Sequence, residues 1–173
     1  DGGFIPIVYV KRPGEPRHGF SSKLSSTRDR IQPLDLDGDG KSDLLFYRPG
    51  SGYASAYLSN GDGTLREILY STPSAPSQNG FLGDVKSEKD TAVVLDLDGN
   101  GQDDFLWYRP GAGHAWAQLS NGDGTLRSMV YSTPDQPSQN GFSGDVKSSL
   151  GRVDRADALD LDGLVDADSR VVV

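Results

Sequence analysis

The sequence of 173 residues has no cysteine and only two histidines, His18 and His114. Disulfide bonds and thiolate metal ligands are therefore excluded, and a zinc or copper site built from His or Cys is not expected. No apolar run approaches the ~20 residues that a membrane-spanning helix needs, and no signal peptide is visible at the N-terminus. We therefore expect no membrane insertion.

Basic residues are also scarce. Lysine and arginine together number 17 against 25 aspartates and glutamates, which gives a net charge of −8. Nucleic acid is not an expected partner, because binding it requires a basic face. The first residue is Asp1 instead of methionine, so we expect a processed or excised piece of a longer protein. A secreted protein can dispense with disulfides when calcium holds its loops, and we expect an extracellular location.

The acidic residues that are present are distributed unevenly. Twelve of the 25 lie in three nine-residue segments, 35–43, 96–104 and 160–168. Each segment begins with Asp-Leu-Asp-Gly and ends with Asp, and the first two also carry glycine at position 6. Scattered surface acids would not keep this spacing. We therefore interpret the segments as cation-binding loops instead of a merely acidic surface.

Side-chain oxygen atoms fall at positions 1, 3, 5 and 9 of the first two loops, and a backbone carbonyl is available at position 7. Calcium prefers six to eight oxygen ligands, whereas magnesium keeps more of its water. The sequence therefore predicts Ca²⁺ as the bound cofactor. The predicted ligands of the first loop are Asp35, Asp37, Asp39, the carbonyl of Lys41, and Asp43. Those of the second loop are Asp96, Asp98, Asn100, the carbonyl of Gln102, and Asp104.

An EF-hand is the alternative calcium motif, but it requires glutamate at position 12 and a helix on each side. Position 12 is Phe46 in the first loop and Trp107 in the second, and both flanks are strand-like. The third loop is degenerate, because Leu164 and Val165 replace the oxygen ligand and the glycine. Whether this loop binds metal stays open. Its candidate ligands are Asp160, Asp162 and Asp168.

A 61-residue repeat covers nearly the whole chain. Residues 35–87 and 96–148 are identical at 38 of 53 positions. Arg-Pro-Gly and Asn-Gly-Asp-Gly turns separate short apolar and aromatic segments, which in the second copy are residues 92–95, 104–108, 114–119 and 126–131. We expect an all-β fold of β-propeller blades, each made of four antiparallel strands. A β-solenoid or a sandwich is the alternative.

The repeats divide the chain into four parts. We expect residues 1–29 to form the end of a preceding blade and a linker, and residues 30–90 and 91–154 to form full blades with calcium loops. Residues 155–173 are expected to begin a further blade with the degenerate loop. Two full blades do not close a ring, which usually takes at least four. We therefore expect further blades of the same parent chain, or other copies of this chain, as partners.

The pattern Asp-x-Asp-x-Asp-Gly-x-x-Asp followed directly by a hydrophobic strand, as in residues 35–46, resembles the FG-GAP/VCBS repeat. The Arg-Pro-Gly and Ser-Asn-Gly-Asp-Gly-Thr elements are similar to those of microbial members of that family. The family builds the propeller of integrin α subunits and of secreted microbial proteins, including propeller lectins. The resemblance implies that the loop joins the first two strands of a blade and binds calcium. It implies less about function, because the family includes adhesins, lectins, toxin shells and accessory domains of enzymes.

Several side chains outside the loops could contact a ligand. Aromatic faces suit the apolar side of a sugar ring, but aromatic side chains also pack between sheets. We favour packing for Phe46 and Trp107. The candidate ligand-binding residues are Arg48, Tyr53, Arg109, His114 and Trp116.

The sequence offers little for catalysis, because no Ser-His-Asp order repeats and no thiol is present. We expect a protein that is not an enzyme. The predicted function is a secreted, calcium-binding, lectin- or adhesin-like module that recognises a glycan or protein ligand. The alternative is a non-catalytic structural or targeting segment of a larger secreted enzyme or toxin.

Overall fold

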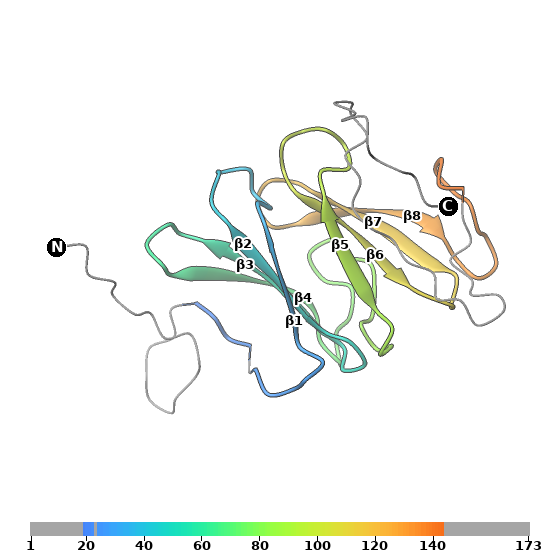
Figure 1. Cartoon of the computed structure of the whole chain (residues 1–173), viewed down its shortest axis with the longest axis horizontal. Coiled ribbons are helices and arrows are strands. Elements are labelled where there is room, and N and C mark those ends of the chain that lie inside the picture. The colour runs from blue at the N-terminus through green and yellow to red at the C-terminus, as the bar shows by residue number, and fades with distance from the viewer. Residues whose placement is uncertain (1–18, 23, 144–173) are drawn as a thin grey trace, which may run out of the picture.

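The computed structural model describes residues 19–22 and 24–143, and this part of the chain contains eight β-strands and no helix. The expectation of an all-β fold is therefore confirmed. The first four strands form an antiparallel sheet in the order β1-β2-β3-β4 (Figure 1). They are β1 (Arg30–Leu34), β2 (Asp43–Arg48), β3 (Tyr53–Ser59) and β4 (Leu65–Ser71).

The second sheet has the same topology, in the order β5-β6-β7-β8. Its strands are β5 (Thr91–Leu95), β6 (Asp104–Arg109), β7 (His114–Ser120) and β8 (Leu126–Ser132). Every strand of the second sheet begins 61 residues after its counterpart, as the starts at residues 30 and 91 illustrate. No helix in the described ranges is long and apolar enough to cross a membrane.

The strands predicted for the second copy are all present, and each is one residue longer than predicted. The extra residues are members of ladder pairs, such as Thr91 opposite Tyr108 and Ser132 opposite Ala115. Pairing with a neighbouring strand therefore extends each strand past its apolar segment. The predicted further blade at residues 155–173, with Asp160, Asp162 and Asp168, lies outside the described residues, as does most of the predicted segment 1–29.

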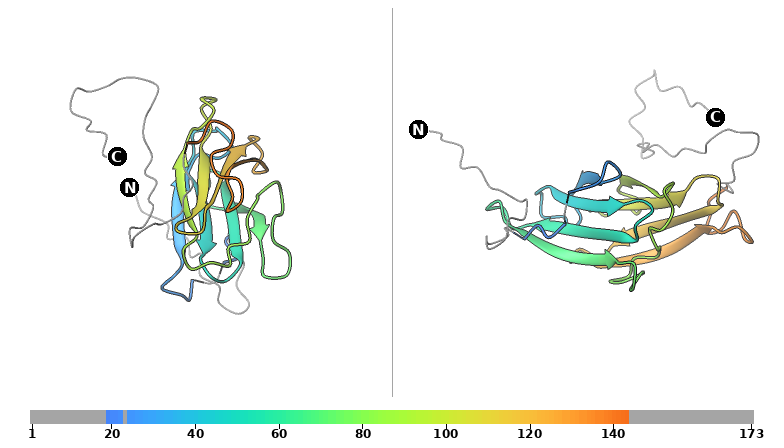
Figure 2. Two further views of the ribbon diagram at one scale, coloured as in Figure 1. Left: turned by 90° about the vertical axis from the view of Figure 1, so that its right-hand side faces the viewer. Right: turned by 90° about the horizontal axis from the view of Figure 1, so that it is seen from below.

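Alternation of side chains gives each sheet two faces. Leu45 and Tyr47 of β2 belong to the main core, which also contains Phe105 and Trp107 of β6. The two sheets therefore pack against each other, as the neighbouring four-stranded arrays in Figure 2 show. Phe46 lies in a smaller cluster on the opposite face of the first sheet. Phe46 and Trp107 are both buried, as expected.

The connection from β4 to β5 contributes an aromatic wedge to this interface. The ring of Phe81 stacks on Tyr70 of the first sheet at 5.7 Å and meets Trp107 of the second edge-on at 5.3 Å. The backbone N–H of Leu126 donates to the carbonyl of Asn79 at 2.9 Å. Gly80 must be glycine here, because a Cβ would lie 1.7 Å from the Leu126 carbonyl oxygen. The connection thus ties β4 of one sheet to β8 of the next.

Candidate functional site

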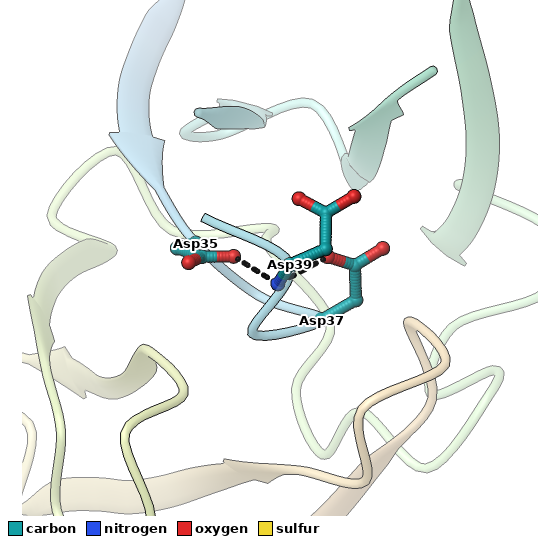
Figure 3. Close-up of side chains that lie close together, drawn as sticks. All are labelled: Asp35, Asp37 and Asp39. Atoms are coloured by element: carbon teal, nitrogen blue, oxygen red, sulfur yellow. Dashed lines mark hydrogen bonds between the residues drawn. The ribbon is translucent and has the colours of Figure 1, made fainter. Parts of the chain in front are cut away.

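The first acidic loop joins β1 to β2 and gathers three carboxylates. One carboxylate oxygen from each of Asp35, Asp37 and Asp39 lies within 4.8 Å of the others (Figure 3). The Asp35 carboxylate also accepts hydrogen bonds from the backbone N–H groups of Asp39 at 3.1 Å and Gly40 at 2.9 Å. The loop therefore curls around Asp35, with Gly40 in the left-handed conformation at φ +79°.

The second loop, between β5 and β6, gathers a similar set. Carboxylate oxygens of Asp96, Asp98 and Asp104 lie within 4.8 Å of one another. The Asp96 carboxylate accepts backbone hydrogen bonds from Gly99, Asn100 and Gly101 at 2.8, 3.2 and 2.9 Å. The sequence predicted side-chain ligands at positions 1, 3, 5 and 9 of both loops. The structure brings together positions 1, 3 and 5 in the first loop and positions 1, 3 and 9 in the second, and Asp43 is not part of the first set.

The aspartates at position 9 also hold the fold. Asp43 and Asp104 have no exposed surface. The carboxylate of Asp43 accepts backbone hydrogen bonds from Leu36 at 3.0 Å and Ser59 at 2.8 Å. Burial raises the pKa of Asp43 above its ordinary value, although those two hydrogen bonds oppose the rise. Asp104 is bonded in the same way by Leu97 and Ser120, and burial raises its pKa as well. Sequence reasoning treated these residues as metal ligands alone.

The donor set of both loops fits a hard cation. All candidate side-chain ligands are carboxylate or amide oxygens, which calcium prefers over nitrogen or sulfur. Lys41 introduces a positive charge that competes with a cation for Asp39, because its ammonium group pairs with the Asp39 carboxylate. This hydrogen bond, together with one from the Lys41 backbone, lowers the pKa of Asp39. The carbonyl groups of Lys41 and Gln102 stay predictions as ligands.

A separate depression of about 490 Å³ lies on the face of the first sheet that turns away from the second sheet. It contains two predicted ligand-binding residues, Arg48 and Tyr53. Tyr53 is 44% exposed, although most other large apolar side chains of the described residues are covered. The remaining lining includes Ser21, Phe46, Ser55 and Glu67. The depression therefore combines an accessible aromatic ring with hydroxyl and charged groups.

Glu67 is the polar centre of this depression. Its carboxylate accepts hydrogen bonds from Ser21 Oγ at 2.5 Å, Ser55 Oγ at 3.0 Å and the Tyr57 hydroxyl at 3.0 Å. Sequence reasoning missed Glu67, Ser21 and Ser55. A signal was present in part, because the period of two places Tyr53, Ser55 and Tyr57 on one face, and Tyr57 pairs with Glu67 across the hairpin.

Arg48 forms one side of the depression and is held in place. Its Nε donates to Asp29 Oδ1 at 2.5 Å, and its guanidinium carbon lies 6.0 Å from the centre of the Phe46 ring. Arg109 is the counterpart of Arg48 in the second repeat. It donates to Asp90 at 2.7 and 3.1 Å and to Asp84 at 2.6 Å. Both arginines therefore fix the segment that precedes their own sheet, and a ligand-binding role for either stays a prediction.

The second repeat fills the equivalent space with a different pair of side chains. His114 and Trp116 take the positions of Tyr53 and Ser55, and their rings stack at 5.0 Å. His114 Nδ1 and Trp107 Nε1 are buried without a hydrogen-bond partner in the described part of the protein. Burial, assisted by the charge of Arg109, lowers the pKa of His114. The structure thus gathers the five predicted ligand-binding residues into two sets related by the repeat.

No family model matches the sequence, and no curated protein matches it. Among solved structures, the chain is similar to a lectin of Agrocybe aegerita, described as specifically recognising non-reducing terminal N-acetylglucosamine. The two are 24% identical with a TM-score of 0.44, over 60% of this chain and 24% of that one. The chain therefore spans about a quarter of the length of that lectin.

Proposed function

We propose that this chain is a calcium-binding recognition module of an extracellular protein and that its ligand is a glycan. The observation that carries the proposal is the depression around Tyr53, where an exposed aromatic ring adjoins Glu67 and a group of hydroxyls. Binding sites for small ligands typically pair an apolar surface with a few convergent polar groups. The proposed role is binding and not catalysis.

The chemistry of the depression suits a sugar ring. The exposed face of Tyr53 offers apolar contact to the C–H side of the ring. Glu67 can accept hydrogen bonds from sugar hydroxyls, and Ser21 and Ser55 beside it can donate as well as accept. Since Glu67 is already oriented by three hydroxyl donors, little side-chain freedom would be lost when a ligand binds.

Calcium would act at the opposite end of the strands from the depression. Asp35, Asp37 and Asp39 would hold one ion, and Asp96, Asp98 and Asp104 would hold another. A bound ion would neutralise the mutual repulsion of these carboxylates and fix the β1–β2 and β5–β6 connections. Calcium modules of extracellular proteins work at the high calcium concentration outside cells. The chain's acidic, cysteine-free composition is compatible with that setting.

A glycan array in calcium-containing buffer tests the recognition role, and it should include glycans that end in N-acetylglucosamine. Binding to a defined glycan class is expected, and Tyr53→Ala should weaken it at least about tenfold through loss of the stacking surface. Ile31→Ala is the matched control, because Ile31 is 43% exposed but does not line the depression. Silence across the array would sink the glycan proposal and favour the structural or targeting role.

A further inference from the structure

The two acidic loops are bonded directly to each other. The backbone N–H of Asp35 donates to Asp103 Oδ2 at 2.6 Å, and the backbone N–H of Asp103 donates to the Asp35 carbonyl at 2.8 Å. Asp35 is position 1 of the first loop, and its carboxylate belongs to the first carboxylate cluster. Asp103 is position 8 of the second loop and is not among the predicted ligands of either loop.

A second link lies beside the first. Ser120 Oγ donates to the Leu36 carbonyl of the first loop at 2.5 Å, and the Ser120 backbone N–H donates to Asp104 Oδ1 at 2.7 Å. The Gln102 side chain also packs over Gly38, where a Cβ would lie 2.9 Å from Gln102 Cγ. The backbone of the first loop therefore contacts two residues that adjoin the second cluster. Gln102 lies near that cluster in the sequence, and Ser120 donates to Asp104 of the cluster.

The position of Asp103 makes it sensitive to both loops. It is covalently linked on one side to Gln102, whose carbonyl is a predicted ligand, and on the other to Asp104, whose carboxylate is in the second cluster. Ordering of the second loop would therefore fix Asp103 and, through it, the backbone of Asp35. The Asp103 carboxylate also brings negative charge to the first loop, which favours a cation there. The equivalent residue of the first loop is Ser42, which carries no charge.

We propose that Asp103 couples the two calcium loops, so that an ion in one loop increases the affinity of the other. The inference rests on the proposed calcium binding. Asp103 acts as a positioning residue: it holds Asp35 without contacting the ion. Because binding that orders a shared element lowers the cost of ordering it a second time, the coupling is positive. Thermodynamic linkage also requires that each loop change the other's affinity by the same factor.

Calorimetric titration of the full chain with Ca²⁺ tests this in a cycle. Asp37→Ala disables the first loop, and the affinity of the second loop is then measured; Asp98→Ala does the reverse. In each variant, the intact loop should bind Ca²⁺ at least about fivefold more weakly than the same loop does when its neighbour is filled. With Asp103→Ser, which installs the residue of the first repeat, this difference should fall sharply, because the bond from Asp35 to the Asp103 carboxylate is lost. Asp103→Asn keeps an oxygen that can accept from Asp35 and should retain more of the coupling.

Ser42→Ala is the matched control, because it alters position 8 of the other loop and should leave the coupling unchanged. Equal affinities with and without a functional neighbour would overturn the inference while leaving calcium binding intact. The same conclusion would follow if Asp103→Ser left the difference in place. The absence of binding heat at either loop would overturn the proposed calcium role itself, and with it the coupling. Circular dichroism of each variant separates these results from misfolding.

Discussion

At the scale of single residues, Gly40 shows how the first acidic loop depends on backbone conformation. Its φ is +79°, and a Cβ would meet no atom within 4 Å. Gly40→Ala should therefore destabilise the metal-free protein by about 1–2 kcal/mol through backbone strain alone. Gly40→Asn should cost less, because asparagine tolerates this conformation. Denaturant unfolding in chelator measures both values, and equal losses for Ala and Asn would contradict the explanation.

The Arg48–Asp29 pair predicts a pH dependence. Burial raises the pKa of Asp29, but hydrogen bonds from Arg48, Ser26 and Ser25 outweigh it and hold the pKa below its ordinary value of 3.8. The folded protein therefore binds this proton less tightly than the unfolded chain does. The stabilising effect of the ionised Asp29 carboxylate is complete above about pH 4. It is lost as the pH falls through the pKa that Asp29 has in the folded protein.

Asp29→Asn should accordingly lower the free energy of unfolding by about 1–3 kcal/mol at pH 7, and the gap to wild type should shrink below pH 4. Urea unfolding across this pH range provides the measurement. Glu88→Gln is a suitable control, because the Arg28–Glu88 pair is exposed and should contribute below about 1 kcal/mol. A gap that persists unchanged at pH 3 would show that Asp29 acts through something other than its charge.

The loop residues could be predicted from the sequence, but only Arg48 and Tyr53 of the depression could. The spacing of the aspartates indicates the roles of Asp35 and Asp96, because the backbone N–H groups that bond their carboxylates lie within the same nine-residue segment. Glu67 gives only a partial signal through the hairpin, because its partners also include Ser21, 46 residues away, which only the folded chain brings near. Asp103 was missed for the same reason, since its contact with Asp35 spans 68 residues.

At the scale of elements, the connection between β4 and β5 contributes more to the packing of the two sheets than its polar sequence indicates. Phe81 is 2% exposed and touches aromatic rings from both sheets. Its repeat counterpart Phe142 stacks on Tyr131 at 5.6 Å but remains half-buried. The same motif thus performs an inter-sheet role in the first copy and a more superficial one among the described residues of the second.

Phe81→Ala should therefore destabilise the protein by about 3–5 kcal/mol, because it leaves a cavity between two sheets. Phe142→Ala should cost clearly less, because less of its surface is covered. Urea unfolding of both variants at neutral pH tests the difference. Similar losses in the free energy of unfolding would mean that the packing of Phe81 between the sheets adds no stability beyond that of the more exposed Phe142.

The strands themselves were predictable because each is a short apolar segment bounded by Gly-containing turns. Gly52 and Gly113 adopt φ values of +82° and +74° at equivalent turns, as their positions predict. What the pattern omitted was the last residue of a strand such as β8, where Ser132 is polar yet paired with Ala115. Hydrogen bonding extends strands through polar residues that a hydrophobic pattern does not mark.

At the scale of the whole molecule, the outer face of the second sheet resembles the face that the first sheet buries. Leu34, Leu45 and Tyr70 are buried between the sheets. Their counterparts Leu95, Leu106 and Tyr131 are only half-buried among the described residues. Because the two repeats are alike, we expect the second sheet to bury this face as the first sheet does. This expectation supports the proposal that another blade packs on this face, whether from the same parent chain or from another copy.

Both acidic loops join strands of packed sheets, so calcium should stabilise the molecule as a unit. Binding to the folded state alone adds about 2.7 kcal/mol per site at a calcium concentration 100 times Kd. Chelation should therefore lower Tm by several degrees, and added Ca²⁺ should restore it better than Mg²⁺. The double variant Asp37→Ala/Asp98→Ala should not respond to chelator. Identical melting curves of the wild type in calcium and in chelator would refute the metal-binding role of both loops.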